Sequence, residues 1–146
     1  MNSLTGCEHM KKAVFAGISV MMLVVPLAMQ INWGSKTFAD TLQIDPADIT
    51  KLQLSIPGTS SYNSTSNRER INTFLRYMNK QDYTLIKGNK PSYLPMTASM
   101  IYVSGNDKTD FIVSFGNKIL VSHTYYEVTE GAIDNEFLRT FYHSLD

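Results

Sequence analysis

Apolar residues fill one unbroken run near the N-terminus, and further along the chain they recur with the periods of strands and helices. The run extends from Ala13 to Ile31 without a charged side chain. As a helix it would measure roughly 28 Å at about 1.5 Å per residue, close to the roughly 30 Å hydrocarbon core of a bilayer. It shows no polar face at helical spacing, which disfavours a buried core helix. The sequence therefore predicts a membrane-directed segment at residues 13–31.

Beyond this segment, alternation of apolar and polar residues predicts the strands of a sheet. Leu52, Leu54 and Ile56 alternate with polar neighbours, which is typical of a half-buried strand. Gly116-Asn117 lies between two apolar runs and suits a two-residue hairpin turn, because both residue types tolerate positive φ. The expected strands are residues 49–56, 82–86, 99–105, 110–115 and 118–128, with 59–66 as either an edge strand or a loop. They predict one antiparallel sheet of about five to six strands.

Apolar residues spaced by three and four predict two amphipathic helices. Ser66 and Glu69 fit a capping box, so the first helix should be capped by Ser66. Its apolar stripe is Ile71, Phe74, Leu75 and Met78, and that of the terminal helix is Ile133, Phe137, Leu138, Phe141 and Leu145. Packed on the sheet, the two helices give an α+β domain in the order β-(β)-α-β-β-β-β-α, preceded by the N-terminal membrane-directed helix.

Charged residues on either side of the apolar run predict its orientation. Lys11 and Lys12 precede the run, whereas Asp40 and Asp48 follow it. The positive-inside rule therefore places the N-terminus in the cytoplasm and the residues after Ala39 outside the membrane. We expect an extracytoplasmic domain.

The apolar run has two possible fates. Residues 37–39 approximate the small-x-small pattern of signal peptidase, so cleavage would fall between Ala39 and Asp40 and release a secreted domain. The run is, however, longer than the usual signal core, and Trp33 with Lys36 is typical of an interfacial anchor. These features favour a single-pass membrane protein instead, and both alternatives stay open.

Residues 1–39 are thus expected to be a signal peptide or an anchor, and residues 40–146 one extracytoplasmic domain. This domain has no cysteine, because Cys7 precedes the apolar run. Disulfides, a cysteine nucleophile and cysteine-ligated metals are excluded there, as is the acylated cysteine of a bacterial lipoprotein. The chain has a formal net charge of +0, and removing residues 1–39 leaves a mildly acidic domain. We expect no nucleic-acid partner.

Asp110 and His123 are the candidate catalytic residues. If Gly116-Asn117 forms the hairpin, Asp110 lies opposite His123 on the neighbouring strand, where a carboxylate could orient an imidazole as a general base. A hydrolase would then need Ser122 or Ser114 as its nucleophile. No G-x-S-x-G elbow accompanies them, and an exposed cross-strand charge pair is the simpler interpretation.

A metal site would need ligands from His123, Glu127, Glu130 and His143. These residues lie on separate predicted elements without a recognised spacing. We therefore expect no metal, and no motif in the chain predicts another cofactor.

Tyrosines are the candidate binding residues. Their large contact area and hydroxyl group suit recognition of a glycan or a peptide. Tyr93 lies in the longest predicted loop, and Tyr125 and Tyr126 lie on a predicted strand. Ordinary packing is the alternative for the strand tyrosines, since tyrosine is a good strand former.

Five features together resemble small extracytoplasmic domains of unknown function in Firmicutes. They are "ITKLQL", "NRERINTFLRYMN", "DFIVSFGNKILV", "YYEV" and the amphipathic terminal helix, over roughly residues 48–145. The resemblance implies a Gram-positive cell-surface context, either secreted or membrane-anchored, and implies no functional residues. The missing lipidation cysteine departs from the lipidated members of that group.

The sequence therefore favours a non-enzymatic binding or interaction module outside the cytoplasm. Its expected partners are a cell-envelope protein, a peptide or a wall glycan, with the membrane as a further partner if residues 13–31 are retained. One alternative is an anchored ectodomain that modulates a membrane complex or a sensor. The other is a hydrolase that uses Asp110 and His123.

Overall fold

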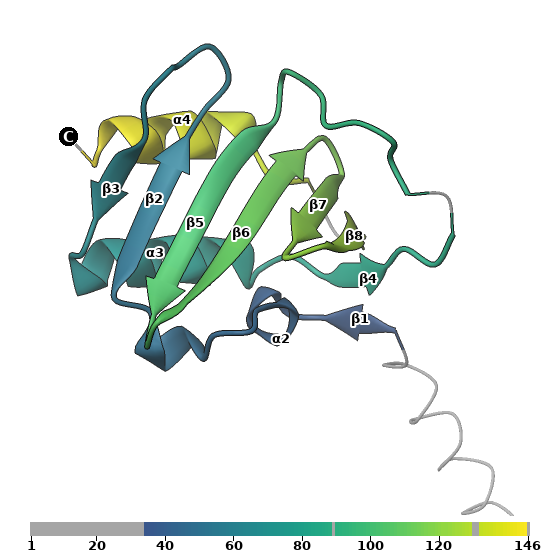
Figure 1. The fold of residues 1–146 in the computed structure, drawn as a ribbon, viewed down its shortest axis with the longest axis horizontal. Helices are drawn as coiled ribbons and strands as arrows, with labels where there is room; N and C mark the ends of the chain where they lie inside the picture. Colours follow the sequence, from purple (N-terminus) through teal and green to yellow (C-terminus); the bar gives the residue numbers. More distant parts are fainter. Residues whose placement is uncertain (1–33, 89, 130–131, 146) are drawn as a thin grey trace, which may run out of the picture. The chain divides into compact units, whose positions relative to one another are not determined.

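Figure 1 shows a computed structural model of the chain, which describes residues 34–88, 90–129 and 132–145. Its strands are β1 (Ser35–Lys36), β2 (Lys51–Ser55), β3 (Asn63–Thr65), β4 (Tyr83–Leu85), β5 (Ser99–Gly105), β6 (Lys108–Phe115), β7 (Lys118–Val121) and β8 (Thr124–Val128). Its helices are α2 (Phe38–Thr41), α3 (Arg68–Met78) and α4 (Asn135–His143), with a 3-10 helix η1 (Pro46–Asp48). The expected membrane-directed segment, residues 13–31, lies outside the described residues. Among the helices that are described, none has the length and apolarity to cross a bilayer.

The strands form one antiparallel sheet in the order β1-β4-β8-β7-β6-β5-β2-β3. The predicted α+β class with a single antiparallel sheet is confirmed, but the sheet has eight strands rather than about five to six. Two features account for the difference. β1 adds a strand at one edge, and the expected last strand, residues 118–128, is divided into β7 and β8. In the same way, α2 adds a third α-helix to the two expected.

Ser122 and His123 form the turn that divides β7 from β8. Their φ angles are 40° and 79°, and the commonest two-residue hairpin turns need positive φ at both central residues. Glycine and asparagine usually mark such turns, so their absence explains why the sequence predicted one continuous strand. The other predicted hairpin is confirmed, with Phe115 paired to Lys118 across Gly116-Asn117.

Helices α3 and α4 cover one face of the sheet (Figure 1). Phe74 on α3 and Leu138 on α4 are fully buried, as are Leu54, Ile101 and Ile112 on the central strands. All of these side chains belong to one hydrophobic cluster. Because successive strand residues point to opposite faces, the residues between these strand positions point away from the helices.

Helix α3 is capped by Asn67 rather than by the expected Ser66. The Asn67 side-chain oxygen accepts hydrogen bonds from the amides of Glu69 and Arg70, at 2.9 and 3.3 Å. Asparagine is as effective an N-cap as serine, so sequence preference alone does not separate two adjacent candidates. The expected apolar stripe of this helix is confirmed, since its four members are all buried.

Residues 35–41 belong to the fold, although the expected domain boundary falls between Ala39 and Asp40. Strand β1 pairs with β4 at the edge of the sheet. Phe38 is 0% exposed, and its ring centre lies 5.9 Å from that of Tyr83. A chain that begins at Asp40 would therefore lack an aromatic side chain of the core.

We predict that a chain beginning at Asp40 is less stable than one beginning at Gly34. Loss of the buried Phe38 side chain should lower the free energy of unfolding by about 3–5 kcal/mol, the cost of removing a large aromatic residue from a core. Urea denaturation of both chains measures the difference. Phe38→Ala in the longer chain is the matched control, and equal stability of all three would show that Phe38 does not support the core.

Tyr83 is buried at the start of β4, and its hydroxyl donates a hydrogen bond to the Met78 carbonyl at 2.9 Å. Burial raises the pKa of Tyr83 well above its ordinary value of 10.0. The folded chain therefore holds this phenolic proton more tightly than the unfolded chain does. Stability should be complete below the ordinary pKa and should fall as the pH rises above it, because the unfolded chain ionises first.

We predict that Tyr83→Phe reduces this alkaline loss of stability. At neutral pH the variant should be about 1 kcal/mol less stable, because it loses one hydrogen bond. Between about pH 9 and pH 11.5, where tyrosines of unfolded chains ionise, its free energy of unfolding should fall less steeply than that of the wild type. Urea denaturation at a series of pH values measures both slopes, with the exposed Tyr93→Phe as control. Parallel slopes for wild type and Tyr83→Phe would contradict the assignment.

Candidate binding site

The face of the sheet opposite α3 and α4 carries large apolar side chains. They are Met100 and Tyr102 on β5, Phe111, Val113 and Phe115 on β6, Leu120 on β7 and Tyr125 on β8. We call these residues the open face; most are partly exposed, whereas Val113 is 0% exposed. The outer face of an antiparallel sheet is normally polar where it meets water. The open face is therefore the unusual surface of the fold.

Aromatic rings contact one another along the open face. Tyr62, which precedes β3, has its ring centre 5.6 Å from that of Tyr102, and Tyr102 lies 5.0 Å from Phe111. Tyr62 is 43% exposed and its hydroxyl lies 3.4 Å from the sulfur of Met100. Partial burial raises the pKa of Tyr62 above its ordinary value, with a smaller contribution from Tyr102. These rings form a semi-exposed platform over the middle of the sheet.

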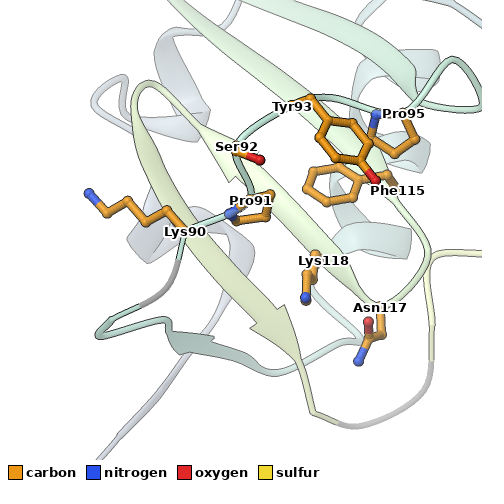
Figure 2. A pocket seen from close by; sticks show the side chains of 8 residues that line it. All are labelled: Lys90, Pro91, Ser92, Tyr93, Pro95, Phe115, Asn117 and Lys118. Carbon is orange, nitrogen blue, oxygen red and sulfur yellow. The ribbon is translucent and has the colours of Figure 1, made fainter.

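Strands β2 and β6 end, and β5 and β7 begin, at the same end of the sheet, which we call the loop end. The β4–β5 loop, residues 86–98, reaches this end, and three hollows open beside it. The first, the lysine hollow, has a volume of about 470 Å³. It is lined by Lys90, Pro91, Ser92, Tyr93, Pro95, Phe115, Asn117 and Lys118. Figure 2 shows the rings of Tyr93 and Phe115 at one end of this hollow and Lys90 at the other.

The other two hollows adjoin each other. The methionine hollow, of about 290 Å³, is lined by residues 55–60 together with Tyr62, Met96, Ala98 and Met100. The arginine hollow, of about 200 Å³, is lined by Ile56, Pro57, Thr97, Ser99, Asn135 and Arg139. Ile56 and Pro57 line both, so the two hollows meet at these residues. Met96 is 98% exposed and Tyr93 is 77% exposed, which places two large side chains of the loop in solvent.

The charged residues in the linings of the three hollows are positive. Lys90 and Lys118 line the first and Arg139 lines the third, and among the described residues no aspartate or glutamate belongs to these linings. Within the described residues these three side chains form no ion pair and no hydrogen bond. Glu127 lies opposite Lys118 in the sheet, but its carboxylate accepts a hydrogen bond from the Asn117 side chain at 2.9 Å. The loop end thus offers unpaired positive charge beside apolar surface.

Asp110 and His123 do not form the expected cross-strand pair. The ladder between β6 and β7 ends at Ile112 and Val121, and His123 lies in the turn beyond it, exposed to solvent. The counted register holds as far as Ile112 and Val121, but the strand that was expected to continue reverses at Ser122 before it reaches His123. The Asp110 carboxylate is 0% exposed and accepts a hydrogen bond of 2.7 Å from the Ser122 hydroxyl.

Asp110 instead links three parts of the chain. Its second oxygen accepts hydrogen bonds from the backbone amides of Gln43 and Ile44, at 2.8 and 3.1 Å. The carboxylate thereby ties the segment that follows α2 to the β7–β8 turn through Ser122. Both oxygens of this buried carboxylate accept hydrogen bonds from the protein, which indicates a structural role for Asp110.

We predict that Asp110→Ala lowers the free energy of unfolding by about 3 kcal/mol or more. The substitution leaves the buried amide of Ile44 and the part-buried amide of Gln43 without their acceptor, and an unpaired buried group costs about 1–3 kcal/mol. Ser122→Ala removes one hydrogen bond to a charged group and should cost about 1.5–3 kcal/mol. Denaturation measures both, and the exposed Ser64→Ala serves as control. If Asp110→Ala were as mild as Ser64→Ala, the carboxylate would not hold these segments together.

The other predicted sites are distributed as follows. Tyr93 lines the lysine hollow, and Tyr125 lies on the open face with its ring centre 6.4 Å from that of Phe115. Tyr126 points to the opposite face and is buried in the core, where burial raises its pKa. Ser114 is buried as well. Among the described residues, no three histidine, cysteine or acidic side chains are grouped to hold a metal ion, and Glu130 lies outside that part of the chain.

The sequence did not single out the residues that make the loop end distinctive. The three hollows are lined by residues from different loops, strands and helix α4, among them Met96, Met100, Phe115, Lys118 and Arg139. One signal was present in the sequence. Residues 100–103 and 111–113 are apolar at consecutive positions, so both faces of β5 and β6 carry apolar side chains. A strand with one wet face would alternate instead.

Comparison with known proteins gives no relative. The chain matches no family model, no curated protein and no solved structure.

Proposed function

We propose that this chain is an extracytoplasmic binding module that holds an anionic partner of the cell envelope at its loop end. The observation that carries the proposal is the combination of positive side chains in the linings of two separate hollows with an exposed apolar surface. Lys90, Lys118 and Arg139 line hollows without a neighbouring acid in the lining. The extracytoplasmic location rests on the apolar run at residues 13–31 and on the charges that flank it.

The shape of the loop end favours an extended partner. The hollows lie on both sides of the β4–β5 loop, with Tyr93 and Pro95 lining one and Met96 and Ala98 lining another. An extended chain can contact several shallow hollows in succession, whereas a compact small molecule is usually enclosed in one deep pocket. Exposed methionine and tyrosine side chains supply adaptable apolar contact for such a chain.

A peptide fits this surface as the partner. Its backbone is extended, its acidic side chains match the lysines, and its apolar side chains match the open face and the methionine hollow. The charges would orient the partner, and the apolar contacts would supply most of the affinity.

The test is sedimentation of the purified full chain, in mild detergent, with isolated Gram-positive cell envelopes. Reversing both charges of the lysine hollow, with Lys90→Glu and Lys118→Glu together, should weaken binding roughly tenfold or more. Binding by the wild type should also fall as salt is raised, because exposed charges are screened.

Lys80→Glu, beyond the C-terminal end of α3, changes one charge away from the hollows and is the control. It should bind almost as the wild type does. Equal binding by the wild type and the double variant, or equal loss in the control, would show that the loop end is not the binding site.

A further inference from the structure

Ser99 is one of the residues that line the arginine hollow, and its hydroxyl group is unusual. The residue is 1% exposed, and among the described residues its Oγ has no hydrogen-bond partner. A buried hydroxyl without a partner is destabilising, and native structures contain few of them. Ser99 lines a hollow to which other hydrogen-bond donors also belong, so a ligand in this hollow could bind the Ser99 hydroxyl.

The lining of the arginine hollow combines a few polar groups with apolar walls. Ile56 and Pro57 form apolar surface, while Asn135 and Arg139 extend from the first turns of α4. The nearby Asp134 does not line the hollow, because its carboxylate caps α4 by accepting the Glu136 amide at 2.8 Å. Arg139 is therefore the one charged residue in the lining.

The volume of the arginine hollow is larger than a single bound water molecule would need. A water occupies about 30 Å³ of liquid, and the hollow measures about 200 Å³. It is also smaller than the usual pocket for a complete small molecule, which starts at about 300 Å³. A hollow of this size suits one small chemical group at the end of a longer ligand.

We propose that the arginine hollow binds the terminal carboxylate of a peptide whose last side chain is small and apolar. The Arg139 guanidinium can bind a carboxylate through two parallel hydrogen bonds. The Ser99 hydroxyl and the Asn135 amide are further donors, and Ile56 contacts the side chain. A carboxylate has one negative charge to match one guanidinium, whereas a dianionic phosphate would keep part of its charge unmatched.

The rest of such a peptide has a continuous path. The arginine hollow meets the methionine hollow at Ile56 and Pro57, and the methionine hollow contains Tyr62 and Met100 at the margin of the open face. The residues preceding the carboxylate would lie along these side chains. The inference thus deepens the proposed function and rests on it, because it assigns the partner a chemical class and a direction.

Calorimetric titration of the full chain in mild detergent tests the carboxylate. The probes are acetyl-alanyl-alanine with a free carboxylate, the same dipeptide with an amidated end, and inorganic phosphate. The free acid should bind roughly tenfold or more tightly than the amide, since the amide loses the charge-assisted hydrogen bonds. Phosphate should compete weakly. Equal binding of acid and amide, no binding of the acid, or phosphate that binds as well as the acid would each overturn the proposal.

Two variants separate binding from folding. Arg139→Gln should weaken binding of the free acid roughly tenfold or more and leave binding of the amide unchanged. Ser99→Ala should weaken binding of the acid severalfold without lowering the resistance to urea, because the hydroxyl it removes has no partner in the fold. Arg76→Gln on the outer surface of α3 is the matched control. Unaltered binding of the acid by Arg139→Gln, or a clear loss of stability in Ser99→Ala, would contradict the assignment.

The two proposals can fail separately. If cell envelopes bind the wild type and not the lysine double variant, but acid and amide bind alike, the carboxylate site is wrong and the binding module stands. If envelopes bind neither form of the chain, the proposed function itself is wrong.

Discussion

The organisation of this domain follows from the packing of its helices on one face of the sheet. Helices α3 and α4 pack on one face of eight antiparallel strands, and in the part of the chain that the structure describes no helix covers the other face (Figure 1). A sheet of this kind normally places polar residues on its wet face. Here the central strands β5 and β6 carry apolar residues on both faces, so apolar surface remains at the surface beside the β4–β5 loop. The proposed binding end is a consequence of this composition.

The buried carboxylate of Asp110 holds a second part of the structure together. It links the amides of Gln43 and Ile44 to the Ser122 hydroxyl. The segment before it is also fixed, because Phe38 packs in the core and β1 pairs with β4. The chain is thus integrated into the domain from Ser35 onward. A cut between Ala39 and Asp40, as the small-x-small pattern predicts, would remove β1 and Phe38 from the domain.

Local patterns in the sequence predicted the parts of the fold that depend on interactions between residues close together in the chain. The stripe of α3, the Gly116-Asn117 hairpin and the α+β class all follow from periodicity and turn chemistry. The Ser122-His123 turn could not be predicted, because serine and histidine rarely adopt positive φ angles. In the structure, the Ser122 hydroxyl donates a hydrogen bond to the Asp110 carboxylate, which is a tertiary contact that the local sequence does not reveal. The same missed turn displaced the Asp110 and His123 pairing. Tyr125 and Tyr126 were both candidate binding residues, but adjacent strand residues point to opposite faces, and Tyr126 is the buried one.

The candidate site was harder to predict because its residues are assembled by tertiary contacts. Ser99 and Arg139 are forty positions apart in sequence, and nothing in either stretch marks a site. Ser99 carries a cost that packing does not explain, because its buried hydroxyl has no partner among the described residues, and the exposed Arg139 belongs to the same lining. Alanine at position 99 would satisfy the fold as well or better. Natural proteins often keep such locally unfavourable groups where binding requires them. The coincidence of both in one hollow, beside apolar surface, therefore argues for recognition of a ligand.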